Sequence, residues 1–373
     1  MIQVVIIMIK ANYEDSITNL ACSIRKYFEI DYKHNTIKEV DEVLDRIKPK
    51  NVVVILYDGM GYNILNRNLD KDSFLVKNCI RDYSSVVPCT TTASTTSMLS
   101  GMNPCEHGWL GWDLYIKPED MIVTMFTNKL KDTSIDAKDY NVVRKYYDYN
   151  TITDDINNAG KYSSKILFPF GEGAYSNIKD MNNRIISECK KAGKKYIYAY
   201  YEDPDYIMHE MGTDHIKVNK VINKINKATE ELCSKLGKDT VVIVTADHGH
   251  LNSKSILLSD YEDFYNTLDG DVWVEGRMCA FKVKEGMNDT FEKLFKEYFG
   301  NDFILKSKKE IIDEKIFGIG DEHKLFRDSL GDYFGLAISD KFFKYSIYST
   351  DLKSMHAGFT EDEMRIPLII ISK

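Results

Sequence analysis

The chain has 373 residues, more than one simple hydrophobic core needs, so we expect a main domain with a large insertion, or two domains. Its hydrophobic content of 43% and charged content of 28% are typical of a globular protein. The formal net charge of −8 leaves no basic surplus to neutralise phosphates, which excludes a nucleic-acid polymer as the main partner.

The cysteines and the N-terminal residues indicate the cellular compartment in which the protein is expected. Seven cysteines are scattered without a CxxC pair, a pattern that favours reduced thiols over a disulfide framework or a zinc finger. The apolar run over residues 2–8 is too short to span a membrane and lacks the features of a signal peptide. Either Met1 or Met8 fits as the native start. We therefore expect a cytoplasmic protein without membrane association, of undetermined oligomeric state.

The N-terminal part begins with helices and continues into a buried strand. Apolar residues at helical spacing predict helices over residues 16–28 and 37–47. Residues 51–57 form a short β-branched run, which predicts a strand buried on both faces. Asp58 directly follows this strand, and two glycines come shortly after it.

Further along the chain, predicted strands and helices alternate. Strand-like runs over 161–168 and 195–201 each follow a helical stretch. A helix over 215–236 leads into a strand over 240–245, and residues 365–371 form the last strand. Alternation of this kind predicts an α/β fold with a mostly parallel central sheet and helices on both faces.

The region 257–345 has a different pattern of predicted strands and helices. It combines strand-like pieces over 277–283 and 333–338 with one clear helix over 289–298, and it interrupts the main pattern. We interpret it as an inserted α+β cap subdomain. The expected organisation is an N-terminal helical segment packed on the core (1–49), a catalytic core (50–256 and 346–373) and the cap (257–345).

An aspartate follows each of three predicted strands: Asp58, Asp205 and Asp247. One such residue is readily explained as a helix N-cap, but the carboxyl ends of parallel strands meet at one edge of a sheet. Carboxylates gathered there offer hard oxygen ligands for a divalent metal.

Histidines accompany these aspartates. His248 directly follows Asp247, and His209 lies four residues after Asp205, so on a helix His209 and Asp205 share a face. His356, in a Met-His-Ala-Gly segment, is a further candidate ligand. His250 is equally prominent in the sequence but has no paired carboxylate at ligand spacing, and we expect a supporting role for it.

Hydroxyl side chains crowd the segment 90–97. A threonine at the start of a helix lies beside backbone N–H groups that can hold an anion. A metal bound to its oxygen would lower the hydroxyl pKa and produce a nucleophile at neutral pH. Taken alone, the segment is explained as well by a capping turn. Trp109 and Trp112 follow it, and packing under the cap is favoured for them over stacking on a flat substrate group.

In this order, the segments resemble the alkaline phosphatase superfamily, and within it the type I phosphodiesterase/nucleotide pyrophosphatase family. The matching pieces are residues 52–61, 87–108, 200–212, 245–250 and 356–370. The resemblance runs from about residue 50 to the end of the chain, and it is loose before that point and in the middle insertion. It implies an alkaline-phosphatase-like three-layer sandwich with a mostly parallel central sheet.

The resemblance also implies roles for single residues. Asp58, Asp247 and His248 would hold one metal ion, which also binds the nucleophile Thr91. Asp205, His209 and His356 would hold a second ion, which activates water. Thr91 lies three residues after Pro88 and ten before Gly101, as the family's nucleophile does, but Thr90 and Thr92 are close enough for the assignment to slip by one.

Two neighbours of the nucleophile, Thr92 and Ser94, are implied as substrate-binding residues. Family members that cleave nucleotides carry an asparagine where this chain has Ser94, so a preference for nucleotides is weakened. No arginine lies in the nucleophile segment to grip a monoester dianion, which favours diesters.

The function implied is a metal-dependent hydrolase that cleaves phosphodiester or pyrophosphate bonds of a small phosphorylated substrate through a phospho-threonine intermediate. Two divalent ions are expected, with Zn²⁺ suiting the His and Asp donors and Mn²⁺ as the alternative. The alternative activities are those of a phosphonate hydrolase, a phosphomonoesterase or a phosphomutase of the same superfamily. A binding protein without turnover is disfavoured, because all six metal ligands and a hydroxyl are present.

Overall fold

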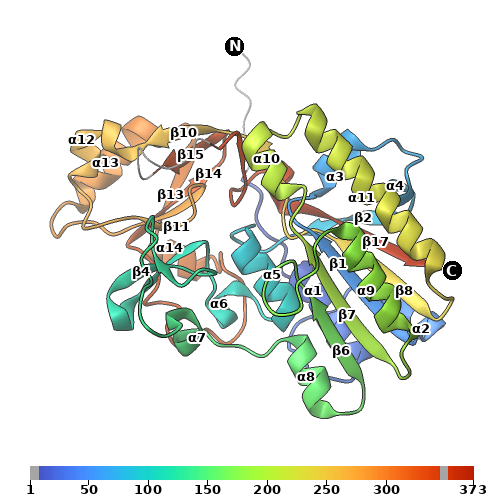
Figure 1. Ribbon diagram of the computed structural model, residues 1–373. Coiled ribbons are helices and arrows are strands. Elements are labelled where there is room, and N and C mark those ends of the chain that lie inside the picture. Colours follow the sequence, from blue (N-terminus) through green and yellow to red (C-terminus); the bar gives the residue numbers. More distant parts are fainter. Residues whose placement is uncertain (1–7, 345–351) are drawn as a thin grey trace.

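The computed structural model describes residues 8–344 and 352–373 and contains two lobes, each built on its own β-sheet (Figure 1). The choice between Met1 and Met8 as the start, and the first residues of the expected core segment 346–373, lie outside the described residues.

The larger lobe contains a six-stranded sheet in the order β2-β17-β8-β1-β7-β6. Its strands are β1 (Asn51–Tyr57), β2 (Cys79–Ser84), β6 (Ser163–Leu167), β7 (Lys195–Tyr201), β8 (Thr240–Thr245) and β17 (Arg365–Ser372). The four strands β8, β1, β7 and β6 are parallel, as expected. The last strand, β17, runs antiparallel to both β8 and β2, so the sheet is mixed at this side.

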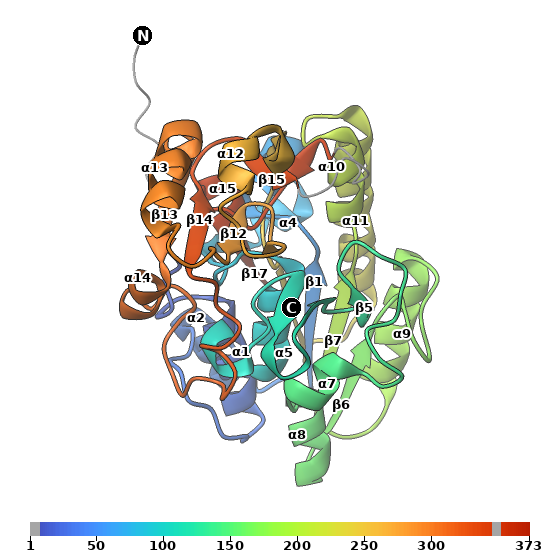
Figure 2. The same ribbon diagram turned by 90° about the vertical axis from the view of Figure 1, so that its left-hand side faces the viewer.

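The central strands are buried because helices cover both faces of the sheet. Every residue of β1 and of β8 is buried, which explains their continuous apolar sequences. In Figures 1 and 2, α9 and α11 lie over one face, and α1, α2 and α5 over the other. The fold is therefore the expected three-layer α/β sandwich.

The helices of this lobe match the predicted ones closely at 16–28, 37–47 and 215–236. They are α1 (Ile17–Tyr27), α2 (Lys38–Ile47), α3 (Tyr62–Asn68), α4 (Phe74–Lys77), α5 (Thr91–Ser100), α8 (Ile152–Ala159), α9 (Ile178–Lys190), α10 (Asp205–Met211), α11 (Ile216–Lys235) and α15 (Glu361–Met364).

The smaller lobe contains a seven-stranded sheet in the order β13-β14-β12-β11-β3-β4-β5. Its strands are β3 (Asp113–Ile116), β4 (Met121–Thr124), β5 (Lys129–Leu130), β11 (Trp273–Val274), β12 (Met278–Phe281), β13 (Phe303–Ser307) and β14 (Tyr333–Ala337). The helices are α6 (Pro104–His107), α7 (Val142–Tyr146), α12 (Glu262–Tyr265), α13 (Asn288–Phe299) and α14 (Lys308–Asp313), with 3₁₀ turns η1 (Lys117–Glu119) and η2 (Leu258–Asp260).

This second sheet draws on two separate parts of the sequence. Strands β11 to β14 come from the predicted insertion 257–345, but β3, β4 and β5 come from within the segment expected to form the core. The junction is the antiparallel pairing of Val274 with Asp113. The segment that carries the predicted nucleophile therefore leads directly into the smaller lobe.

Two small sheets complete the fold: β10 (Lys254–Leu257) pairs with β15 (Lys341–Lys344), and β9 (Leu251–Asn252) pairs with β16 (Ser354–Met355). The β9–β16 pair brings the segment after Asp247 beside the one that carries His356. Across residues 8–344 and 352–373, the structure contains no helix with the length and apolar character required to cross a bilayer.

Candidate metal-dependent active site

The three aspartates meet because their strands are neighbours in the sheet. Strand β1 lies between β7 and β8, and their registers pair Tyr57 with Tyr201 and Leu56 with Thr245. Three parallel strands thus end at the same level. Beyond that edge, the backbone N–H of Asp205 donates to the carbonyl of Asp58. The arrangement predicted from the strand ends is confirmed.

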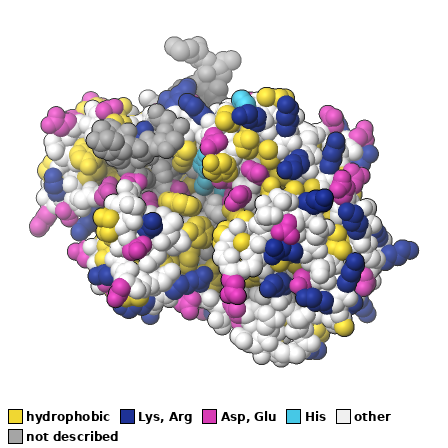
Figure 3. Space-filling view, in the orientation of Figure 1, with side chains coloured by type: hydrophobic (Ala, Val, Ile, Leu, Met, Phe, Trp, Pro, Cys, Tyr) yellow, Lys and Arg dark blue, Asp and Glu magenta, His cyan; other side chains and the backbone are white. Residues whose placement is uncertain are grey.

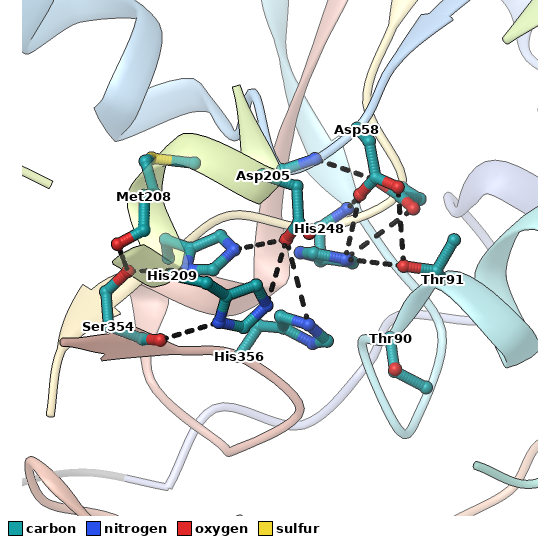
Figure 4. A network of polar contacts seen from close by, with 12 residues as sticks. Asp58, Thr90, Thr91, Asp205, Met208, His209, His248, Ser354 and His356 are labelled. Carbon is teal, nitrogen blue, oxygen red and sulfur yellow. Dashed lines mark hydrogen bonds and ion pairs between the residues drawn. The ribbon is translucent and has the colours of Figure 1, made fainter. Parts of the chain in front are cut away.

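Thr91 faces two of the predicted metal ligands. It is the first residue of α5, and its Oγ1 lies 3.5 Å from Asp58 Oδ2 and 3.3 Å from His248 Nε2 (Figure 4). His248 Nε2 in turn lies 3.3 Å from Asp58 Oδ1 and 3.6 Å from Asp247 Oδ2. One hydroxyl, two carboxylates and one imidazole nitrogen therefore converge on a single point.

The neighbouring hydroxyls point elsewhere. Thr90 Oγ1 donates to Glu275, and Thr92 is completely buried, its hydroxyl without a hydrogen-bond partner among the described residues. Ser94 is also completely buried, and its hydroxyl contacts that of Ser85. The burial of Thr92 and Ser94 does not match the substrate-binding role expected for them, because α5 turns both into the packed interior.

A second group of donors lies around Asp205. Its Oδ1 is 3.4 Å from His209 Nε2 and 3.8 Å from His356 Nε2. His250 Nε2 lies nearer still, at 2.5 Å from the same oxygen. Potential ligand atoms of these four residues all lie within 4.8 Å of one another. The expected trio is thus brought together, and His250 joins it, although the sequence offered no carboxylate at ligand spacing for it.

The ring orientations of three histidines are fixed by backbone carbonyls. The Nδ1 atom of His209 lies 2.8 Å from the carbonyl oxygen of Ser354. The Nδ1 atom of His248 lies 3.1 Å from the carbonyl oxygen of Gly249, and that of His356 lies 3.3 Å from the carbonyl oxygen of Cys89. A carbonyl only accepts hydrogen bonds, so each Nδ1 must carry the proton. Each Nε2 therefore presents a lone pair to the carboxylates, as metal-ligating histidines do.

Two of the carboxylates each have one oxygen without a hydrogen-bond partner. Asp58 Oδ1 and Asp247 Oδ2 are buried, and neither has a hydrogen-bond partner among the described residues. Burial and the nearby Asp205 raise the pKa of Asp58 well above its usual range, and burial together with Asp58 does the same to the pKa of Asp247. Buried carboxylates left in this state call for positive charge, so the donor set fits divalent cations.

Two supporting side chains were not anticipated. The hydroxyl of Tyr200, a β7 residue, donates to Asp58 Oδ2 and orients that carboxylate. Ser354 donates from Oγ to the Met208 carbonyl, and the same oxygen lies 3.1 Å from His250 Nδ1. In the sequence, Tyr200 is indistinguishable from the other aromatic residues of a buried strand, and Ser354 belongs to no motif.

The site is open on one side. Thr91 is partly exposed, and the side chains of Asp205 and His209 keep 16% and 18% exposure, whereas Asp247 and His248 have none. Figure 3 shows a hollow between the two lobes with a histidine side chain at its edge. Trp109 is buried, as packing under the cap requires, but Trp112 is 45% exposed.

The family follows from a match over most of the chain. The sequence model of the type I phosphodiesterase / nucleotide pyrophosphatase family matches residues 52–298. The chain belongs to this family. As a type I phosphodiesterase/nucleotide pyrophosphatase family member, it carries in the matched range every predicted metal ligand except His356, which lies beyond it.

Solved structures of two other proteins have a similar fold. Murine ectonucleotide pyrophosphatase/phosphodiesterase 5 is 16% identical, with a TM-score of 0.64 over 85% of this chain and 87% of that one. Phosphonoacetate hydrolase from Sinorhizobium meliloti 1021 is 15% identical, with a TM-score of 0.64 over 86% and 90%. At this identity, the likeness shows the shared fold.

One curated relative matches over a shorter stretch. GPI ethanolamine phosphate transferase 3 of Schizosaccharomyces pombe is 21% identical in a 150-residue alignment that covers 38% of this chain. The chain spans only 16% of that protein's length.

Proposed function

We propose that this family member is a two-metal hydrolase that cleaves phosphodiester or pyrophosphate bonds through Thr91. The observation that carries the proposal is the placement of the Thr91 hydroxyl against both Asp58 and His248. One of the murine structures of similar fold is that of an inactive threonine-to-alanine variant in complex with AMP.

Two sets of residues would hold the ions. Asp58, Asp247 and His248 would bind one together with Thr91, and Asp205, His209 and His356 would bind the other. Mixed imidazole and carboxylate donors suit Zn²⁺, and Mn²⁺ is the alternative. Bound there, the ions would supply the positive charge that acidifies the attacking hydroxyl and balances the phosphoryl oxygens.

The protein's own groups then define two displacement steps. Thr91 Oγ loses its proton to solvent and forms a bond to phosphorus, while the bond from phosphorus to the leaving oxygen breaks. Water then attacks phosphorus and releases a proton, the bond from phosphorus to Thr91 Oγ breaks, and Thr91 Oγ takes up a proton to restore the enzyme. The N-terminus of α5 places backbone N–H groups beside the phosphoryl oxygens during both steps.

The substrate we propose is a small phosphorylated molecule with a diester or pyrophosphate bond. The nucleophile segment offers hydroxyls and no arginine to pair with a monoester dianion. Residues 50–256 and 346–373 would provide the catalytic groups, and residues 257–345 would help to select the substrate. All seven cysteines are free, which supports placing the protein in a reducing compartment such as the cytoplasm.

The test is an assay of purified Zn²⁺- or Mn²⁺-loaded protein on bis(p-nitrophenyl) phosphate, p-nitrophenyl phosphate and phosphonoacetate. We expect hydrolysis of the diester to exceed that of the monoester, and removal of the metal with a chelator to abolish it until metal is restored. Faster turnover of the monoester, or phosphate release from phosphonoacetate alone, would overturn the proposal in favour of the corresponding alternative.

His250 gives a prediction about metal affinity. Its Nε2 contacts Asp205, and groups that orient metal ligands typically contribute 10–100-fold to affinity. We expect His250→Ala to weaken Zn²⁺ binding by about 10–100-fold in competition with a chromophoric chelator. His215→Asn is the control, because His215 caps α11 outside the donor group and asparagine is itself a good N-cap. Unchanged affinity in the His250 variant would show that the contact does not support the site.

A further inference from the structure

A basic groove lies where helices α9 and α11 pack together. The two helices are joined there by Asn182 of α9, whose side-chain amide donates to the Ala228 carbonyl of α11 at 2.8 Å. The groove has a volume of about 690 Å³. Its charged lining consists of five lysines and one glutamate: Lys179, Lys220, Lys224, Lys227, Lys235 and Glu231. Five positive charges and one negative charge leave the lining at +4, on a chain whose net charge is −8.

The protein itself does not neutralise these lysines. All five are exposed, and within residues 8–344 and 352–373 none of their Nζ atoms forms an ion pair or a hydrogen bond. Asp180 of α9 is already paired with Arg184 of the same helix, at 3.0 Å. Lys224 acts electrostatically on Asp203 without forming an ion pair with it. Unpaired ammonium groups gathered on a concave surface attract an anionic partner.

The lysines of α11 form a row along the helix. Lys220, Lys224 and Lys227 are spaced four and three residues apart, so they share one side of α11. From Lys220 to Lys235 the row is about 22 Å long, which an extended peptide of about seven residues spans. Figure 3 shows Lys and Arg side chains along α11 and α9, on the same face of the molecule as the hollow between the lobes.

The uncharged lining distinguishes between kinds of anionic partner. Among the described residues that line the groove, none is an aromatic residue that could stack on a base, and none is an arginine. The apolar lining residues Ile178 and Leu232 are buried, so they cannot insert into a bilayer. Asn183 is exposed in the groove, and its carboxamide can pair with a peptide group. A basic row beside amide and apolar groups suits an acidic peptide.

From this combination we infer that the groove between α9 and α11 binds a short, extended, acidic segment of a partner protein. Carboxylates of the segment pair with Lys220, Lys224 and Lys227, and its apolar side chains cover the floor of the groove. The inference is independent of the proposed function, because no residue of the groove belongs to the two groups of potential metal ligands.

The test uses two fluorescein-labelled peptides, EELEELEE and its uncharged counterpart QQLQQLQQ. Fluorescence anisotropy measures their binding to the full-length protein. We expect the acidic peptide to bind about 10–100-fold more tightly, because several exposed charge pairs each contribute a little. This advantage should shrink at high salt, which screens such pairs.

A double charge reversal locates the binding surface. Lys224→Glu/Lys227→Glu should weaken binding of EELEELEE by about 10–100-fold. The matched control is Lys308→Glu/Lys309→Glu at the start of α14, where glutamate suits the helix N-terminus. It changes the net charge equally and should leave binding unchanged. Urea denaturation should show wild-type stability for the groove variant, since the described structure gives these lysines no ion pair to lose.

Equal binding of the two peptides by the wild-type protein would overturn the inference, and so would undiminished binding by Lys224→Glu/Lys227→Glu. Two other results would assign the groove to a different occupant. One is binding of the wild-type protein, but not of the groove variant, to phosphatidylglycerol vesicles in place of the peptide. The other is a dimer, detected by sedimentation velocity, that the same variant fails to form.

Discussion

Replacing Thr91 with alanine should reduce turnover of a phosphodiester by roughly 10⁴- to 10⁶-fold, the range found when an enzyme loses its covalent nucleophile. The physical reason is geometric. In the described chain, Thr91 Oγ1 lies against Asp58 and His248, whereas the Thr90 hydroxyl is bonded to Glu275 and the Thr92 hydroxyl is enclosed. Steady-state kinetics on bis(p-nitrophenyl) phosphate, with metal content matched between variants, measures the loss.

Variants of the neighbouring threonines test which residue of the threonine run is the nucleophile. Thr92→Ala should keep activity within about tenfold, since the hydroxyl makes no contact that the chemistry needs. Acid-quenched wild-type protein should carry a phosphoryl adduct on the peptide that contains Thr91, detected by mass spectrometry. An adduct on Thr90, or a Thr91→Ala variant that remains active, would refute the role of Thr91.

Among changes outside the candidate metal ligands, Arg277→Ala should lower the free energy of unfolding most, by about 3–5 kcal/mol, because it leaves a buried charge without its partner. Arg277 is completely buried, and its guanidinium pairs with Glu363 at 2.5 and 2.9 Å. Glu363 also accepts from the Gly358 backbone N–H and from Thr360. The pair therefore ties the residue that precedes β12 of the smaller lobe to the segment that follows His356.

Equilibrium denaturation in urea measures this effect, and an exposed pair provides the comparison. Arg327 contacts Glu322, and their side chains are 62% and 34% exposed, respectively. Arg327→Ala should therefore lower the free energy of unfolding by no more than about 1 kcal/mol. Replacing Arg277 and Glu363 together with apolar residues of similar size should restore much of the loss. A loss below 1 kcal/mol for Arg277→Ala would mean that solvent reaches Glu363 readily.

The sequence predicts the large lobe well because its signals are local. The apolar runs at 51–57 and 240–245 are too short for helices and end in aspartate, so both their burial and the position of their ends could be inferred. The register between strands then places Asp58, Asp205 and Asp247 together without any further information.

The smaller lobe was harder to predict because its sheet depends on distant pairing. Strands β3 to β5 have two to four residues each, which is too few to show a periodic pattern. Their link to the rest of the sheet is the pairing of Asp113 in β3 with the distant Val274 in β11. The contact of Glu275 with Thr90 could not be predicted for the same reason: Glu275 belongs to no motif, and Thr90 lies 185 residues earlier. His250 was undervalued because its carboxylate, on Asp205, comes from another strand end.

Asp205 belongs to both groups of potential metal ligands, one with His209, His250 and His356 and the other with Asp58 and His248. Cations held by both groups would share this carboxylate and would not bind independently. The occupancy of either position would then change the affinity of the other, and thermodynamic linkage requires the factor to be equal in both directions. Two such ions would therefore make up one coupled binding equilibrium, in which the composition of the pair, and not the concentration of either metal alone, would set the fraction of competent protein.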